Sequence, residues 1–120
     1  MIDPKRGEIW QASFRMSVGQ EINKDRPVLV ISPDYMGLRN LWIVVPIVHW
    51  KKDRENWPWF VLLTPDANNG LSKKSGADGS QVQSIAKERF IEYVGKVKDL
   101  EVEDVTKAVA LCIGFDPSNI

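Results

Sequence analysis

The run Arg26-Pro27-Val28-Leu29-Val30-Ile31-Ser32 is the strongest β-strand signal in the chain. Its centre is apolar and mostly β-branched, which is typical of a buried strand. Pro27 has no amide proton to give to a neighbouring strand, so it can only begin this one. Pro33 follows and stops the run. The sequence therefore predicts a buried strand over residues 27–31.

The same signals predict five further strands. Residues 41–49 form an almost continuous apolar run, which predicts a central strand with both faces covered. Pro46 lies inside this run and implies a bulge or a locally unpaired edge. The other expected strands are residues 8–14, 57–64, 80–85 and 90–97, and polar loops are expected at 17–25, 51–56 and 65–79.

The last part of the chain changes its period. Val102, Val105, Val109 and Ile113 are spaced as one stripe of an α-helix. Gly114 follows them and is a typical end for a helix. The chain is thus expected to be mainly β, closed by one C-terminal α-helix.

Composition indicates one soluble domain, residues 1–120, of which 43% are apolar and 27% charged. The 16 basic and 16 acidic residues balance, but residues 1–98 carry 15 basic and 11 acidic groups, which permits a polyanionic partner. No apolar run suits a membrane span or a signal peptide, so a cytoplasmic location is expected. With one cysteine, Cys112, and one histidine, His49, we expect no disulfide, no metal and no cofactor.

Five motifs occur in a fixed order along the chain. They are Arg6-Gly7-Glu8-Ile9-Trp10, Gly19-x-Glu21, the run 26–32, Val45-Pro46-Ile47 and Gln81-Val82-Gln83-Ser84-Ile85. In this order and spacing they resemble the MazF/PemK family of toxin–antitoxin toxins, and the likeness spans the chain to the closing helix. The resemblance implies an SH3-like barrel, a twisted antiparallel sheet with a C-terminal helix, that assembles as a homodimer.

The resemblance also implies an activity. Family members are typically metal-independent endoribonucleases that cut single-stranded mRNA at short sequences. They leave a 2′,3′-cyclic phosphate and a 5′-hydroxyl, and a cognate antitoxin inhibits them by covering the RNA groove with its tail. Another toxin, CcdB, has the same kind of fold and poisons DNA gyrase, but residues 115–120 do not match its C-terminal contact residues.

Three residues are the expected catalytic set. Arg26 occupies the position of the family's arginine, and its planar guanidinium can pair with two phosphate oxygens at once. Glu21 keeps the family's glutamate, which either takes part in the chemistry or holds the loop through an ion pair with Arg26 or Lys24. His49 has an intrinsic pKa suited to acid–base catalysis or is simply a histidine at the end of a strand.

Other positions depart from the family pattern. The family has a threonine where this chain has Val48, which cannot donate a hydrogen bond. His49 would replace that threonine only if Pro46 introduces a bulge, because neighbouring strand residues point to opposite faces. Ser80 and Gln83 stand where the family has an acidic and a basic residue, and Asp78 is an alternative candidate for the general base. These changes favour an alternative, a weakened or inactive member that binds nucleic acid or an antitoxin as a regulator.

The expected RNA contacts surround these positions. They are Lys24, Trp50, Ser80, Gln81, Gln83 and Ser84. Trp50, Trp57 and Trp59 flank one polar loop and either stack on bases or fill a core or a dimer interface. Trp50 is the preferred stacking candidate, since a basic segment follows it.

Overall fold

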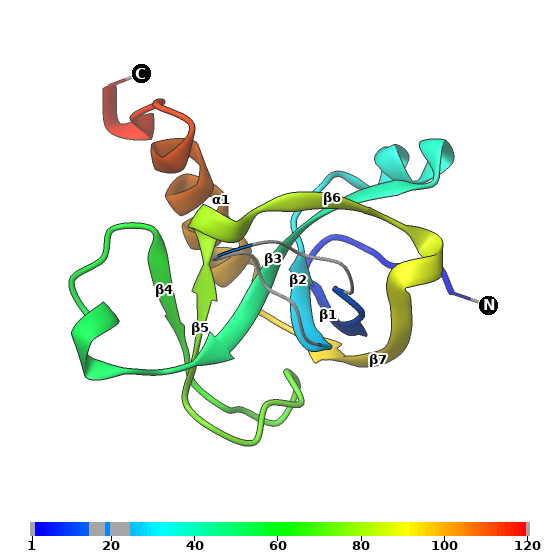
Figure 1. Ribbon diagram of the computed structural model, residues 1–120, viewed down its shortest axis with the longest axis horizontal. Helices are drawn as coiled ribbons and strands as arrows, with labels where there is room; N and C mark the ends of the chain where they lie inside the picture. The colour runs from blue at the N-terminus through cyan, green and yellow to red at the C-terminus, as the bar shows by residue number, and fades with distance from the viewer. Residues whose placement is uncertain (1, 15–18, 20–24, 120) are drawn as a thin grey trace.

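The structure is a computed structural model that describes residues 2–14, 19 and 25–119. The described residues form seven antiparallel strands and one α-helix (Figure 1). The strands are β1 (Glu8–Ala12), β2 (Arg26–Val30), β3 (Leu41–His49), β4 (Phe60–Leu63), β5 (Ser75–Asp78), β6 (Gln83–Ala86) and β7 (Phe90–Lys96). Their order across the sheet is β4-β5-β3-β2-β1-β7, and β6 pairs separately with β3. The expected mainly β fold with a C-terminal helix is confirmed.

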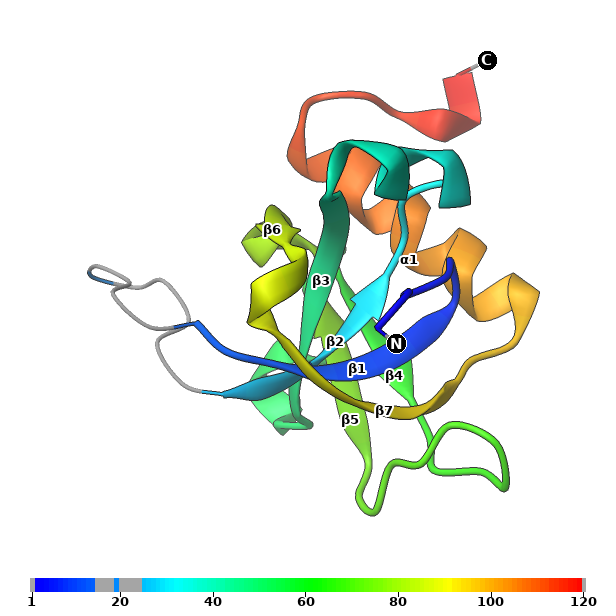
Figure 2. The same cartoon turned by 90° about the vertical axis from the view of Figure 1, so that its right-hand side faces the viewer.

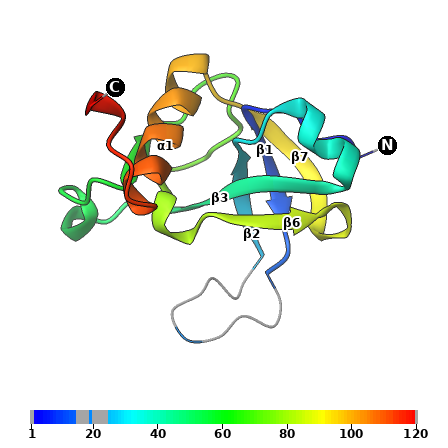
Figure 3. The ribbon, with the colours of Figure 1, turned by 90° about the horizontal axis from the view of Figure 1, so that it is seen from above.

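Strand β3 runs over the predicted range and pairs along both edges. One edge meets β2, while the other meets β6 over Leu41–Val44 and β5 over Ile47–His49. Figure 3 shows β6 lying alongside β3. The Ile31 amide donates to the Ile43 carbonyl, so the N–H and C=O groups of the odd-numbered residues of β3 point toward β2. The carbonyl of Pro46 therefore points toward the other edge of β3.

Pro46 therefore lies between β6 and β5, where neither strand pairs with it. Its missing amide proton removes no sheet hydrogen bond. Of the two expectations for Pro46, the unpaired edge is correct. A bulge is not, because the register between β2 and β3 runs without interruption from Val28 opposite Pro46 to Val30 opposite Val44.

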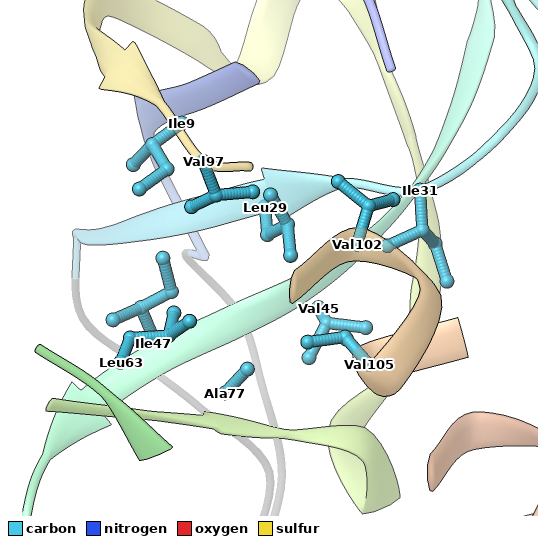
Figure 4. Close-up of a cluster of buried hydrophobic side chains, with 10 residues drawn as sticks. All are labelled: Ile9, Leu29, Ile31, Val45, Ile47, Leu63, Ala77, Val97, Val102 and Val105. Carbon is cyan, nitrogen blue, oxygen red and sulfur yellow. The ribbon is translucent and has the colours of Figure 1, made fainter. Parts of the chain in front are cut away.

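Alternation along the strands builds one apolar cluster on each face of the sheet. The cluster on the helix side is drawn in Figure 4 and contains Ile9, Leu29, Ile31, Val45, Ile47, Leu63, Ala77, Val97, Val102 and Val105. The cluster on the opposite face contains Trp10, Ala12, Phe14, Val28, Val30, Trp42, Val44, Ile85 and Phe90. Both faces of the central strands are covered, as the apolar run 41–49 predicts.

The helix α1 (Asp99–Cys112) packs along one side of the sheet (Figure 2). Val102, Val105 and Ala108 are its buried residues, so the predicted stripe is confirmed at Val102 and Val105. It is wrong at Ile113, which follows the end of the helix and is 74% exposed. Neither α1 nor a shorter helix in the described part of the chain has the length and hydropathy needed to span a bilayer.

Three of the predicted ranges need correction. Strand β4 begins at Phe60 and not at residue 57, and residues 79–81 form a 3-10 turn, η3 (Gly79–Gln81), before β6. Strand β5 lies inside the range 65–79 that was expected to be a loop. Its sequence, Ser-Gly-Ala-Asp, carries no β-forming side chain. At Gly76 the packing requires this, because a Cβ there would lie 2.1 Å from the Phe60 ring. Packing selects small residues here, and the strand signal is lost.

We expect Val105→Ala to lower the free energy of unfolding by about 2 kcal/mol, because Val105 is fully buried between α1 and the sheet. Urea denaturation at fixed protein concentration, followed by tryptophan fluorescence, measures this change. Glu103→Ala on the exposed side of α1 is the control and should stay within about 0.5 kcal/mol of the parent. Equal losses in the two variants would show that α1 does not dock through Val105.

Candidate functional site

A groove of about 540 Å³ opens where the start of β2, the end of β3 and η3 meet the connection between β3 and β4. Its lining residues are Arg26, Val48, His49, Lys51, Arg54, Trp57, Trp59, Asp78, Ser80 and Gln81. A second hollow of about 270 Å³ shares Arg26, Val48 and His49 with it. Residues that lie far apart in the sequence are thus brought together around Arg26.

Arg26 is half-buried at the first position of β2. Its Nε atom is buried and has no hydrogen-bond partner among the described residues. A buried donor left unpaired costs about 1–3 kcal/mol, so an anion that accepts from it would relieve a real penalty. The guanidinium is therefore suited to hold an oxyanion in the groove.

Val48 faces Arg26 across the sheet. Val28 lies opposite Pro46, and continuing this antiparallel register by two residues places Val48 opposite Arg26. The side chain of Val48 is only 7% exposed and lines the groove. The position that holds a threonine in the resembled family therefore forms an apolar wall beside the guanidinium and offers it no hydroxyl.

His49 is the last residue of β3 and is exposed. Because β3 has no bulge at Pro46, the His49 side chain points to the face opposite that of Val48. His49 therefore does not directly replace the family's threonine. The strand ends here, and His49 lines both hollows together with Arg26. His49 carries the only imidazole among the described residues that line the groove.

Asp78 holds the η3 turn in shape. Its Oδ1 accepts hydrogen bonds from the Ser80 amide at 3.0 Å and from the Ser80 hydroxyl at 2.6 Å. The pKa of the nearby Cys112 thiol is raised, first by burial and second by the negative charge of Asp78. Asp78 and Ser80 therefore act together as one structural unit at the edge of the groove.

The structure does not bring every predicted site residue to this groove. Gln81 lines it, but Gln83 and Ser84 lie on β6 opposite Val44 and Ile43. Glu21 and Lys24 lie outside the described residues.

Trp50 does not line the groove either. Its ring packs against Phe60 at 5.6 Å, and the Lys74 ammonium lies 4.8 Å from its centroid. Trp57 and Trp59 line the groove in its place. The sequence singles out both tryptophans and the basic segment 51–54, but it does not distinguish the exposed ring from the covered one.

The groove is basic although the chain as a whole is neutral. Arg26, Lys51 and Arg54 line it against the single carboxylate of Asp78. Within the described ranges, none of these three cations has a carboxylate oxygen within 4.0 Å. The same ranges contain no group of three or more His, Cys, Asp or Glu residues that would hold a metal ion. The arrangement suits a polyanion that pairs with cations directly.

Comparison with known proteins agrees with the fold and the motifs. The model of the PemK-like, MazF-like toxins of type II toxin–antitoxin systems matches residues 5–113. A relative from Mycobacterium tuberculosis, named endoribonuclease MazF9, is 32% identical over 113 residues, which cover 89% of this chain and 93% of the relative.

Solved structures show the same fold at lower identity. MazF from Deinococcus radiodurans superposes with a TM-score of 0.80 at 22% identity, covering 96% of this chain and all of the other. A mycobacterial endoribonuclease in complex with its cognate antitoxin gives a TM-score of 0.71 at 17% identity, covering 92% of this chain and 95% of the other. Because the family model covers nearly the whole chain, the protein belongs to the PemK-like, MazF-like toxins of type II toxin–antitoxin systems.

Proposed function

We propose that the protein is a metal-independent endoribonuclease that cleaves single-stranded mRNA at short sequences, in the cytoplasm, and leaves a 2′,3′-cyclic phosphate and a 5′-hydroxyl. The observation that carries this proposal is the buried Nε of Arg26 in a basic groove, which has no hydrogen-bond partner among the described residues. The name of the relative from M. tuberculosis, an endoribonuclease, supports the same activity.

The reaction needs three things from the groove. The RNA 2′-oxygen loses its proton and forms a bond to the adjacent phosphorus, while the bond from phosphorus to the 5′-oxygen breaks and that oxygen gains a proton. Arg26 is assigned to stabilise the charge that develops on the phosphate oxygens. His49 is assigned to proton transfer, with Glu21 and Asp78 as the other groups able to accept a proton.

Two partners belong to the proposal. A cognate antitoxin would inhibit the protein by covering the groove, and the mycobacterial endoribonuclease of the same fold, which forms a complex with its cognate antitoxin, supports this partner. The protein would act as a homodimer. The apolar side chains of Leu111, Ile113 and Phe115, which are 42%, 74% and 51% exposed at the end of α1, are compatible with a further contact there.

A second candidate function is a member that binds RNA or an antitoxin without cutting. Val48 favours it, because the position opposite Arg26 has no hydroxyl. The two functions differ in whether the bound RNA is cleaved.

Arg26→Ala should reduce RNA cleavage by about 100- to 1000-fold, the usual loss when one group that stabilises developing charge is removed. His49→Ala should reduce it by at least about 100-fold, as for a general acid or base. The assay incubates a long single-stranded RNA with the protein in EDTA and maps 5′-hydroxyl ends. Arg39→Ala, which removes an exposed arginine outside the groove, should cut like the parent. Intact RNA with the parent protein would reject the ribonuclease and favour the binding function.

Val48→Thr should increase the cleavage rate by about 10-fold or more, because it places a hydroxyl opposite Arg26 with almost no change in volume. The mapped-end assay measures this rate. Val61→Thr on β4, outside the groove, is the matched control and should not accelerate cleavage. A rate that stays the same in Val48→Thr would mean that position 48 does not limit the reaction.

Light scattering during size-exclusion chromatography should give twice the mass of the chain at micromolar concentration if the protein is a homodimer. A mass equal to one chain throughout the accessible concentration range would contradict the proposed assembly. This measurement is independent of cleavage, so it tests the partner without testing the chemistry.

A further inference from the structure

Trp57 is the exposed tryptophan of the groove. Its side chain is 37% exposed, whereas the other four tryptophans are buried or half-buried. It lies in the connection between β3 and β4, on the same groove wall as Arg54 and Trp59. An exposed aromatic ring beside cations is the combination that single-stranded nucleic acids bind.

Backbone hydrogen bonds fix the segment that carries this ring. The Trp57 amide donates to the Arg54 carbonyl at 3.1 Å, and the Phe60 amide donates to the Trp57 carbonyl at 3.1 Å. The Gly79 amide donates to the Trp59 carbonyl at 2.8 Å, which ties the segment to η3. The wall is therefore held from both sides before a ligand arrives.

Side-chain packing fixes the orientation of the ring itself. The Trp57 and Trp59 rings lie 5.6 Å apart with an interplanar angle of 31°, and Phe60 meets Trp57 edge-on at 6.2 Å. The Arg54 guanidinium carbon lies 5.7 Å from the centroid of Trp57. These contacts hold Trp57 in place, and 37% of its side chain stays exposed to solvent.

Trp50 shows why this property belongs to Trp57. Both rings have side-chain contacts of their own, but Trp50 does not line the groove and Trp57 does. The basic segment that follows Trp50 in sequence delivers Lys51 and Arg54 to the groove beside Trp57 instead. The cations and the accessible ring are thus on one wall, and Arg26 is on the same groove.

We propose that Trp57, positioned by Arg54 and Trp59, is the stacking platform for one unpaired nucleobase next to the phosphate that Arg26 binds. This inference rests on the proposed function, since it takes single-stranded RNA as the ligand. Bases in a duplex are already stacked and cannot reach the ring, so the platform makes the groove select unpaired strands.

The test measures binding separately from cleavage. The probe is a fluorescein-labelled single-stranded DNA of about 20 nucleotides, longer than the ~4–16 nucleotides that one such groove covers. It lacks the 2′-hydroxyl and cannot be cut by the proposed reaction. Fluorescence anisotropy should give a Kd that is about 5- to 150-fold higher for Trp57→Ala than for the parent, the loss expected for one stacked base.

Two control variants accompany Trp57→Ala. Trp57→Phe keeps a flat ring and should recover most of the affinity. Tyr35→Ala removes an aromatic ring that is 71% exposed on η1 (Asp34–Arg39), outside the groove, and should bind like the parent. Urea denaturation of Trp57→Ala checks that the variant is folded.

A second measurement uses probes with abasic sites, first with the parent protein and then with Trp57→Ala. Abasic sites placed one at a time along the probe should weaken binding to the parent most strongly at one position. Trp57→Ala should be insensitive to the abasic site at that position, because the stacking partner is already absent.

Several results would overturn the inference. An unchanged Kd for Trp57→Ala, together with cleavage that is lost in Arg26→Ala, would leave the ribonuclease standing and remove the platform. Conversion of Trp57→Ala to a monomer with unchanged probe binding would place Trp57 in a subunit interface. Failure of the parent protein to bind the probe would reject the platform, whereas binding without RNA cleavage would reject only the proposed catalysis.

Discussion

The change of partner along β3 is the constraint on which the rest of the structure depends. On one edge β3 pairs with β6 up to Val44 and with β5 from Ile47 onward. The sheet divides at this point, and Pro46, which has no amide proton to give, lies in the interval where neither β5 nor β6 pairs with it. The chain between β5 and β6 must cross that interval, and it does so as the turn η3. The crossing carries Asp78, Ser80 and Gln81 to the groove, so one backbone constraint creates both the opening and one of its walls.

The two apolar clusters explain why the groove lies at the ends of β2 and β3. Towards the middle of these strands, side chains on both faces are buried. Polar or charged groups can be accommodated only where the clusters end, which is at Arg26 on β2 and at His49 on β3. The cost of burial therefore places the guanidinium and the imidazole at the same hollows.

The sequence predicts the central strands well and the small-residue elements poorly. The apolar runs at 26–31 and 41–49 produce strands near the expected limits because burial on both faces demands apolar, β-branched residues. Strand β5 escapes prediction because its fit against the Phe60 ring requires Gly76 rather than a β-forming residue. Family motifs point to Arg26, Ser80 and Gln81, and the chemistry of its side chain points to His49; these four residues share one groove. They do not identify Trp57, because which tryptophan lines the groove is a property of tertiary packing.

The unpaired Nε of Arg26 also bears on how a toxin of this family is held inactive. Within the described part of the chain this buried donor has no acceptor, which is a cost that a ligand supplying an oxyanion relieves. A phosphate of RNA and a carboxylate of an acidic peptide both do so, since the guanidinium pairs with either in the same bidentate geometry. Lys51 and Arg54 extend this preference along the groove without discriminating between the two anions. An aromatic platform does discriminate, because a nucleobase stacks on it and a carboxylate does not. In a groove built this way, charge alone would let substrate and inhibitor compete for one surface, and the ring of Trp57 would be the feature that favours the nucleic acid.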